Sequence, residues 1–227
     1  MVKRLVCIPA RGGSKRIPHK NIKPFLGRPI ISYAIDVAKE LDIEEVMVST
    51  EDPEIAKVAL EYGAKVPFMR SLKNSNDTAD IVDVLLEVLS EYKNRGMEFE
   101  EVVCIFPTAI FATAENIFTS LNHLQHSEGS LPIVRYSYPP QRGLKMNTKG
   151  RLEMVDQSTY KKRTQDIEAF YHDAGQYYCL RVKELLDQKT LYPKLTNFVL
   201  MFESEVQDID NAEDWKLAKM KYLLKFD

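Results

Sequence analysis

A chain of 227 residues with 44% hydrophobic and 28% charged residues has the size and composition of one α/β domain that buries a core. The formal net charge of −2 excludes a basic surface spread over the whole chain, of the kind that binds nucleic acid or an acidic membrane. Any anion site must therefore be a local cluster of basic residues.

The compartment can be predicted from the N-terminus and the cysteines. The apolar run in MVKRLVCIPARGG is too short for a signal peptide, and no run approaches the roughly 18 apolar residues of a membrane span. Cys7, Cys104 and Cys179 each lie in or beside an apolar run, which favours buried thiols in a reducing compartment. We expect a cytoplasmic protein that contacts neither membrane nor nucleic acid.

Strand-like and helix-like segments alternate over the first part of the chain. Apolar runs predict strands at residues 3–9, 46–50, 66–69 and 102–106, and the last is typical of a strand buried on both faces of a parallel sheet. Helices are predicted to begin near Pro29, Asp52, Thr78 and Thr113.

The alternation stops near residue 131. Residues 131–175 carry Pro139-Pro140 and several polar runs, which predict an antiparallel excursion or arm, and residues 177–182 and 198–202 return to the sheet. Asp210, followed three residues later by Glu213, resembles a capping box that opens a terminal helix. The chain is predicted to form a single domain over residues 1–227. Its fold class is α/β, a three-layer, doubly wound and mostly parallel sheet with sites at the carboxyl ends of its strands.

The strongest local signal is IPARGGSKRIPHKN at residues 8–21, where an apolar strand runs into a loop with adjacent glycines and several cations. Gly12 and Gly13 allow the backbone to approach a phosphate, so that successive N–H groups of the loop can form an anion cradle. Arg11, Lys15 and Lys20 could then neutralise a triphosphate. The spacing is not that of a P-loop, and a basic surface turn is the alternative interpretation.

The second signal is the pair Asp208 and Asp210. Residues two apart in an extended chain point the same way, so both carboxylates can face one Mg²⁺ or Mn²⁺ ion. The alternative is that Asp210 only caps the last helix while Asp208 is a solvated loop charge.

Three further features are weaker candidates for a functional site. His123 and His126 lie three apart on a predicted helix without a nearby Cys or acid, which favours surface residues over a metal site. Ser14 has no base partner for nucleophilic catalysis. The loop at residues 171–176 is either a tight turn that needs Gly175 or part of a sugar pocket.

Together these motifs resemble the CMP-sugar synthetases, the acylneuraminate cytidylyltransferase family. The loop at residues 8–21, the segment STEDPEIAKVALEYGAKVPFMR at 49–70, the Asp77-Thr78-Ala79 turn, the Pro107-Thr108 pair and the final DID carry the resemblance, which covers the whole chain. It implies a homodimer that uses CTP, a nonulosonic acid sugar and a divalent metal. It places at the nucleotide Ala10, Arg11, Gly12, Gly13, Ser14, Lys15, Lys20, Asn21, Arg70, Asp77 and Ala79, and at the metal Asp208 and Asp210.

The sugar side departs from the sialic acid members, which carry Gln before the Pro-Thr pair and Ser-Pro-Leu-Arg around it. Here Phe106 precedes the pair and Ala109-Ile110-Phe111-Ala112 follows Thr108. These segments are more similar to the pseudaminic acid branch, and a more apolar pocket suits a sugar that carries methyl and acetamido groups. On this resemblance the sugar is expected to contact Phe106, Thr108, Gln141, Arg142, Arg163, His172, Asp173 and Gln176.

The expected reaction is CTP plus pseudaminic acid giving CMP-pseudaminic acid and pyrophosphate, for surface glycan or flagellin glycosylation. Arg11, Lys20 and Asp208 are the expected catalytic residues, and Asp208 or a metal-bound oxygen takes the hydroxyl proton. Arg142 or Arg163 is the expected partner of the sugar carboxylate. CMP-N-acetylneuraminate or CMP-legionaminate synthesis, a metal-dependent glycosyltransferase and a nucleotide sensor without turnover are the alternatives.

Overall fold

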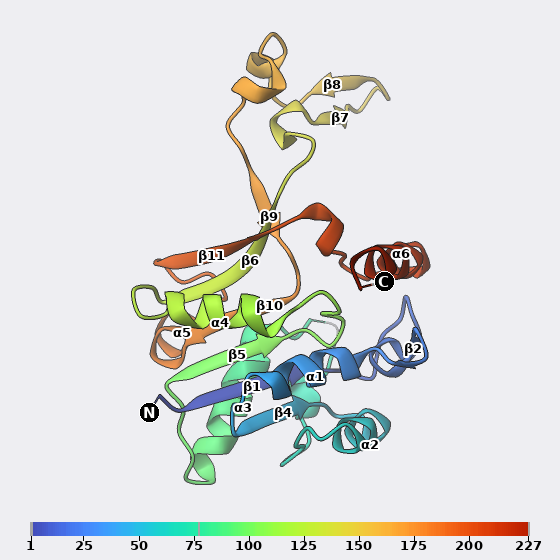
Figure 1. Cartoon of the computed structure of the whole chain (residues 1–227). Helices are drawn as coiled ribbons and strands as arrows, with labels where there is room; N and C mark the ends of the chain where they lie inside the picture. Colours follow the sequence, from blue (N-terminus) through green and yellow to red (C-terminus); the bar gives the residue numbers. More distant parts are fainter. Residues whose placement is uncertain (1, 77, 227) are drawn as a thin grey trace.

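The computed structural model describes residues 2–76 and 78–226 of the chain. One sheet of seven strands crosses the molecule in the order β11-β6-β10-β5-β1-β4, and β9 pairs with β6 off this path (Figure 1). Its strands are β1 (Arg4–Pro9), β4 (Glu45–Ser49), β5 (Glu101–Ile105), β6 (Gly129–Arg135), β9 (Tyr171–Asp173), β10 (Tyr177–Arg181) and β11 (Thr196–Met201).

The sheet is mixed rather than uniformly parallel. β1 runs parallel to both β4 and β5, and β11 runs parallel to β6. β10 lies antiparallel between β5 and β6, and β9 is antiparallel to β6. The parallel half therefore contains the strands that carry the predicted nucleotide loop, while the antiparallel half carries the arm.

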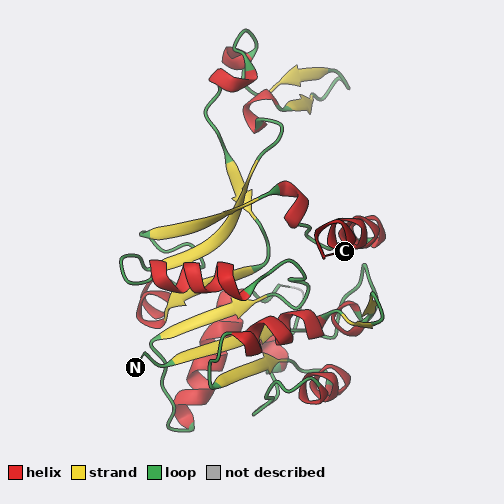
Figure 2. Cartoon of the chain, in the orientation of Figure 1, coloured by secondary structure: helices red, strands yellow, loops and turns green. Residues whose placement is uncertain are grey.

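Helices cover both faces of this sheet, which confirms the three-layer α/β architecture (Figures 1 and 2). In Figure 1, α1 and α4 lie in front of the sheet and α3 lies behind it. The helices are α1 (Ile31–Glu40), α2 (Pro53–Glu61), α3 (Ile81–Asn94), α4 (Ala114–His123), α5 (Val182–Gln188) and α6 (Ala212–Phe226). Two-stranded sheets are formed by β2 (Pro24–Phe25) with β3 (Arg28–Pro29) and by β7 (Leu144–Met146) with β8 (Leu152–Met154).

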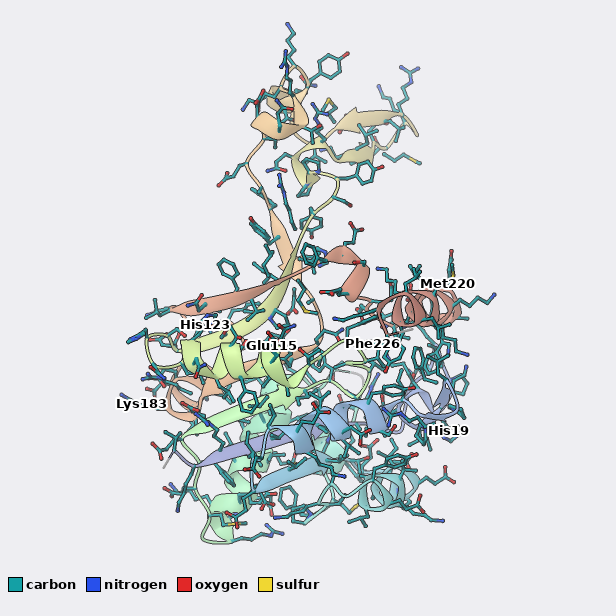
Figure 3. All side chains as sticks on the ribbon, in the orientation of Figure 1. His19, Glu115, His123, Lys183, Met220 and Phe226 are labelled. Atoms are coloured by element: carbon teal, nitrogen blue, oxygen red, sulfur yellow. The ribbon has the colours of Figure 1, made fainter. Side chains whose placement is uncertain are left out.

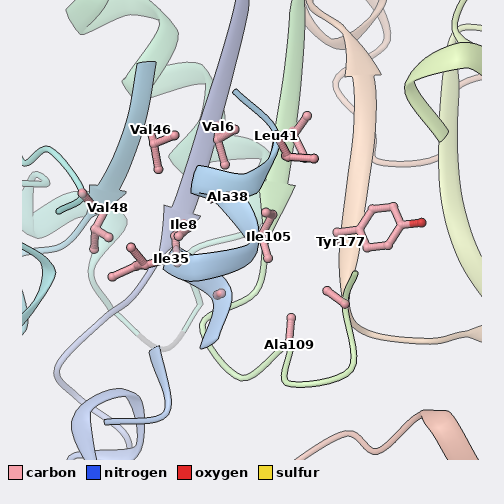
Figure 4. Packing of buried hydrophobic residues seen from close by; sticks show 14 of the residues in the cluster. Val6, Ile8, Ile35, Ala38, Leu41, Val46, Val48, Ile105, Ala109 and Tyr177 are labelled. Carbon is pink, nitrogen blue, oxygen red and sulfur yellow. The ribbon is translucent and has the colours of Figure 1, made fainter. Parts of the chain in front are cut away.

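Alternate residues of β1 build the two faces of the core. Val6 and Ile8 pack with residues of α1, α2 and α4, and Leu5 and Cys7 pack with residues of α3 and α5. Figure 4 shows the first of these clusters, with Ile35 and Ala38 of α1 against the strands. All four β1 residues are fully buried, so the strand that leads to the nucleotide loop is fixed from both sides.

Several helix starts follow the predicted capping residues. Asp52 Oδ1 accepts the N–H of Glu54 at 2.8 Å at the start of α2, and Thr113 caps α4. The helix expected from Thr78 begins instead at Ile81, because the side chain of Asp80 accepts the N–H of Val82. No helix in the described part of the chain is long and apolar enough to cross a membrane.

The strand expected at residues 66–69 is wrong. Of residues 65–69, all of which the structure describes, only Lys65 bridges to β4, in parallel with Met47. Pro67 has no N–H to donate, which explains why the ladder does not continue past the bridge.

The arm is shorter than the predicted excursion at about 131–175. β6 stays in the sheet as far as Arg135, and β9 rejoins it from Tyr171, so the projecting part is residues 136–170. Figure 1 shows this arm extending away from the sheet, with the β7–β8 hairpin near its far end. Leu131 and Val134 of β6 are buried, which explains why the first residues of the predicted excursion belong to the core.

Candidate active site

A cavity of about 320 Å³ opens at the carboxyl ends of β1 and β5. Its walls come from four distant parts of the chain: the loop after β1, the segment before α3, the loop after β5 and the segment before α6. Open α/β sheets bind nucleotides at this edge. The predicted site residues in its lining are Arg11, Lys20, Asn21, Arg70, Ala79, Phe106, Thr108 and Asp208.

A second recess adjoins the first and follows the nucleotide loop. It shares Arg11, Lys20 and Asn21 with the first cavity and continues along Ser14 and Lys15. These cations form the local basic cluster that a chain with a net charge of −2 needs to bind a triphosphate.

The backbone of the nucleotide loop is held by hydrogen bonds within the chain. The Gly12 N–H donates to Glu51 Oε1 at 2.8 Å, and the Ser14 N–H donates to the Gly12 carbonyl at 2.9 Å. These two N–H groups are therefore not open to phosphate in this conformation, contrary to the predicted cradle of successive N–H groups. The prediction of phosphate binding at this loop then rests mainly on its basic side chains.

Lys20 connects the nucleotide loop to the paired aspartates. Its Nζ donates to the Ile209 carbonyl at 2.7 Å and lies 3.9 Å from Asp210 Oδ1. Burial lowers the pKa of Lys20, while the negative charges of Asp210 and Asp208 act in the opposite direction. The Lys20 ammonium group thus connects the nucleotide loop with the Asp208–Asp210 segment. Lys20 and Ile209 lie 189 residues apart in sequence.

Asp208 lines the first recess and Asp210 the second, and the charges of both act on Lys20. The Asp208 side chain is open to solvent at the rim of the cavity, yet enough protein surrounds it that burial raises its pKa, and the charge of Asp210 raises it further. Arg16 Nη2 lies 2.9 Å from Asp210 Oδ1, the same oxygen that faces Lys20.

The cap of the last helix lies one residue beyond the predicted position. Asn211 Oδ1 accepts the N–H groups of Glu213 at 2.8 Å and of Asp214 at 3.1 Å, and α6 begins at Ala212. Asp214 Oδ2 in turn accepts the N–H groups of Asp210 and Asn211, each at 2.9 Å. Since the cap is provided by Asn211 and Asp214, the Asp210 carboxylate is not required for it.

The aspartate pair has the chemistry that a divalent cation needs. The charge of Asp210 raises the pKa of Asp208, a cation between the two carboxylates would relieve this repulsion, and hard oxygen ligands suit Mg²⁺. Among residues 2–76 and 78–226, no group of three or more His, Cys, Asp or Glu side chains forms a complete metal site. A cation at Asp208 and Asp210 would therefore complete its shell with phosphate or water oxygens, as Mg²⁺ commonly does.

The wall opposite the loop is formed by the segment between α2 and α3. Arg70 is buried; its Nε donates to Ser49 Oγ at 3.0 Å and its Nη2 donates to the Ser49 carbonyl. Glu87 of α3 accepts the Ser71 N–H at 2.7 Å and the Asn74 amide, which fixes the segment on α3. The predicted nucleotide residue Asp77 lies outside the described residues.

Phe106 and Thr108 form the third wall, after β5. The Phe106 N–H donates to the Gln176 carbonyl at 2.9 Å, and the Phe106 ring packs edge-on against Tyr178 with centroids 5.7 Å apart. Gln176 is fully buried, and its Oε1 accepts the Phe111 N–H at 3.3 Å. Gln176 thus supports this wall from behind, and its expected contact with the sugar stays a prediction.

His172 and Asp173 lie at the base of the arm. Asp173 Oδ1 accepts the Gly175 N–H at 2.7 Å, and its Oδ2 accepts the hydroxyls of Tyr178 and Tyr192. His172 Nδ1 lies 2.8 Å from the Asp173 carbonyl. The positive φ of 62° at Gly175 agrees with the predicted tight turn, and a sugar contact by His172 or Asp173 stays a prediction.

Gln141, Arg142 and Arg163 belong to the arm and do not line the cavity of their own chain. Gln141 Nε2 donates to the Glu168 carbonyl at 3.0 Å, and Arg142 Nη1 donates to Thr164 Oγ1 at 3.2 Å. Figure 1 shows the arm directed away from the ends of β1 and β5. Their role at the sugar stays a prediction, one that would require a second chain.

Sequence reasoning missed four residues of the site. Asn74 and Asn76 line the cavity, Arg16 pairs with Asp210, and Glu51 binds the nucleotide loop. Arg16 lies within the quoted loop motif, so its charge was a usable signal. The two asparagines lie in a polar stretch without periodicity, and the contact between Glu51 and Gly12 spans 39 residues.

The remaining candidates lie away from this chemistry. Figure 3 labels His123 on α4 and His19 of the nucleotide loop on opposite sides of the molecule, and His123 Nδ1 lies 3.0 Å from Ser130 Oγ. Cys7, Cys104 and Cys179 are buried free thiols, and burial raises the pKa of Cys7 to about 12. Such thiols are poor nucleophiles.

Solved structures share this fold. Over 98% of both chains, the chain is similar to a CMP:2-keto-3-deoxy-manno-octonic acid synthetase complexed with CTP, with a TM-score of 0.70 and 18% identity. A 4-diphosphocytidyl-2C-methyl-D-erythritol synthase from Anaerococcus prevotii gives a TM-score of 0.63 at 12% identity, covering 97% of this chain and 99% of the other. At these identities the likeness shows the fold alone.

Relatives of higher identity show the family. The chain is 35% identical to the pseudaminic acid cytidylyltransferase of Campylobacter jejuni, with 97% of each chain covered. It is 30% identical to the CMP-N,N'-diacetyllegionaminic acid synthase of Legionella pneumophila, covering 95% of this chain and 94% of the relative. The family model described as cytidylyltransferase matches residues 5–222, and the chain therefore belongs to the cytidylyltransferase family.

Proposed function

We propose that this protein transfers CMP from CTP to the anomeric hydroxyl of pseudaminic acid and releases pyrophosphate. The observation that carries the proposal is the convergence of Arg11, Lys20, Arg70 and Asp208 on one cavity at the strand ends. These residues come from three separated segments, the nucleotide loop, the segment before α3 and the segment before α6, and the resemblance implies roles for them at the nucleotide and the metal. The 35% identity to a pseudaminic acid cytidylyltransferase supports the same reaction.

In this proposal the nucleotide lies across the two adjoining recesses. The triphosphate follows the loop, where Arg11, Lys15 and Lys20 neutralise its charge in the ground state and as charge develops on the departing pyrophosphate. The base lies toward Arg70 and Ala79, where the walls are fixed by Ser49 and Glu87. Asn21 Oδ1 is buried without a hydrogen-bond partner within the described structure, so it is an acceptor available to the nucleotide.

Asp208 is the proposed proton acceptor for the attacking hydroxyl. Without a bound cation, burial and the neighbouring Asp210 raise its pKa, which makes its carboxylate a better base than an ordinary aspartate, and a cation on the same carboxylate would lower that pKa again. A divalent cation held by Asp208 and Asp210 would add positive charge beside the reacting phosphate. Lys20, hydrogen-bonded to the Ile209 carbonyl, keeps this segment against the loop.

The sugar side is proposed to favour pseudaminic acid because its wall is apolar. Phe106 contributes an aromatic ring where sialic acid members of the family carry a polar Gln, and Tyr178 supports that ring. An apolar wall accepts methyl and acetamido groups and offers no partner to extra hydroxyls. Legionaminate and N-acetylneuraminate are the competing substrates.

The test of specificity is a comparison of kcat/KM for pseudaminic, legionaminic and N-acetylneuraminic acids, measured as pyrophosphate release with CTP. The proposal requires pseudaminic acid to give the highest value by at least about tenfold. A higher value for either competitor would assign the chain to that sugar instead. Pyrophosphate formed without any sugar would remove the synthetase proposal.

A homodimer is proposed in which the arm, residues 136–170, contacts a second copy. The arm exposes large apolar side chains, with Tyr138 88% and Met146 72% exposed, although it has little core of its own. Light scattering should give twice the chain mass of 26.2 kDa, and replacement of residues 138–168 by a short Gly-Ser linker should give a monomer. A monomeric full-length protein with full activity would contradict the dimer.

For this chemistry the cytoplasm, where CTP is available, is the proposed compartment.

A further inference from the structure

The peptide unit between Arg11 and Gly12 is held at both of its polar ends by side chains. Its carbonyl, that of Arg11, accepts a hydrogen bond from Asn21 Nδ2 at 2.9 Å. Its N–H, that of Gly12, donates to Glu51 Oε1 at 2.8 Å. Hydrogen bonds at both ends restrain rotation of this peptide plane, and with it the point from which the Arg11 side chain leaves the backbone.

The Glu51 side of this arrangement is closely packed. A Cβ atom on Gly12 would lie 2.2 Å from Asp52 Oδ2, so the loop backbone lies directly against residues 51 and 52. Asp52 cannot move away easily, because its Oδ1 caps α2 through the N–H of Glu54 at 2.8 Å. Glycine is therefore required at position 12 for close approach, and the approach brings its N–H to Glu51.

Glu51 belongs to a segment that also holds the opposite wall of the cavity. Just before it, the Ser49 carbonyl accepts the Ala10 N–H at 2.9 Å and a hydrogen bond from Arg70, while the Thr50 carbonyl accepts the Arg70 N–H at 2.8 Å. One short stretch after β4 thus fixes the nucleotide loop on one side and Arg70 on the other. Both Arg11 and Arg70 line the cavity.

We propose that Glu51 is a positioning residue for CTP: it clamps the Arg11–Gly12 peptide together with Asn21 and so aims Arg11 at the phosphates. Glu51 is absent from the lining of both recesses, so it acts through the loop and not by touching the nucleotide. As a carboxylate it would repel a triphosphate if it faced one directly. Because its oxygen accepts the Gly12 N–H, the Glu51 carboxylate can hold the proposed phosphate-binding loop from outside the two recesses.

This inference rests on the proposed function, because it assigns Glu51 a role toward CTP. The test measures CTP binding by calorimetry with the full-length protein in the absence of sugar, for wild type, Glu51→Ala, Glu51→Gln and Glu51→Asp. Glu61→Ala is the matched charge control: Glu61 is the exposed last residue of α2, the helix that follows Glu51, and among its described contacts it pairs only with Lys57 at 3.9 Å. Thermal melting of each variant is measured alongside.

Glu51→Ala should weaken CTP binding about tenfold, the size expected for the loss of one charge-assisted hydrogen bond. Glu51→Gln keeps an acceptor oxygen at the same reach and should bind CTP within about threefold of wild type, whereas Glu51→Asp withdraws the acceptor and should resemble the alanine variant. The KM for CTP should rise in step while the KM for the sugar at saturating CTP stays unchanged. Glu61→Ala should behave as wild type.

The outcomes separate the inference from the function on which it rests. A wild-type protein that does not bind CTP would remove the proposed function itself. Wild-type CTP binding by Glu51→Ala would overturn the inference while the function stands, and so would an equal loss in Glu51→Gln and Glu51→Ala. If Glu51→Ala does not fold, the contrast between the Gln and Asp variants decides in the same way.

Discussion

Replacement of Asp208 by Asn should separate the chemical role of this residue from its effect on stability. Burial and the charge of Asp210 raise the pKa of Asp208 above its ordinary value, so the ionised side chain is less favourable in the folded chain than in the unfolded one. That penalty is present above the raised folded pKa and disappears below the unfolded pKa. At neutral pH, Asp208→Asn in metal-free protein should therefore melt at the same temperature as wild type or higher.

The same substitution should nearly abolish turnover. It removes the proposed proton acceptor and one of two oxygen ligands beside the reacting phosphate, worth about 3–5 kcal/mol of transition-state stabilisation or roughly 10²- to 10⁴-fold in rate. Asp210→Asn should lose less, because Arg16 and Lys20 already neutralise its Oδ1 in the metal-free chain. Asp187→Asn on α5, an exposed residue that lines neither recess, is the control for the loss of one charge.

The assay combines pyrophosphate release with thermal melting across a Mg²⁺ titration in the presence of CTP. Wild type should gain thermal stability as Mg²⁺ and CTP bind together, and Asp208→Asn should lose most of this gain. Wild-type turnover by Asp208→Asn at limiting Mg²⁺ would refute both the metal and the proton role. A lower melting temperature with unchanged rate would instead make Asp208 a structural residue.

Three further outcomes follow from contacts around the cavity. Gly12→Ala places a Cβ 2.2 Å from Asp52 Oδ2 and should raise the KM for CTP more than about tenfold. Gly13→Ala has nothing within 4 Å of its Cβ and should bind CTP like wild type. Equal behaviour of the two variants would contradict the packing argument. Asn211→Ala removes the cap of α6 and should cost about 1 kcal/mol of unfolding free energy in denaturant titrations with kcat unchanged. Burial acts to raise the pKa of Glu87, but its hydrogen bonds hold it below the ordinary value of 4.5, so its stabilising effect is present at neutral pH and is lost as the pH falls through the lowered pKa. Glu87→Gln should flatten the fall of melting temperature below about pH 4.5, and an unchanged profile would show that another group controls it.

The parts of the fold that were predictable are those set by local chemistry. Asp52 and Thr113 act as helix caps where their sequence context indicates, and the consecutive apolar residues of β5 are buried as expected. The cap of α6 was misplaced by one residue, because Asp210 and Asn211 are both favoured caps and only the geometry of Asp214 decides between them. Pairing partners are not local, and the antiparallel insertion of β10 between β5 and β6 has no signature in its own residues.

The residues of the site also divide into those that a contiguous motif predicts and those that only the arrangement of the strands brings into place. The basic loop and the aspartate pair were found because each motif is contiguous, and the structure brings them together through Lys20 and the Ile209 carbonyl. Glu51 was not found, because its function depends on where β4 ends relative to β1 and not on its neighbours in sequence. The arm residues Gln141 and Arg142 could be assigned to a sugar site only by resemblance, since they do not line the cavity of their own chain.

The most direct measurement is the identification of the product formed from CTP and pseudaminic acid with Mg²⁺. Mass spectrometry of the reaction should show CMP-pseudaminic acid, with one pyrophosphate released for each CTP consumed and none released when either substrate is omitted. Release of CMP or CDP without a CMP-linked sugar, or pyrophosphate from CTP alone, would contradict the assignment of this cavity to cytidylyl transfer.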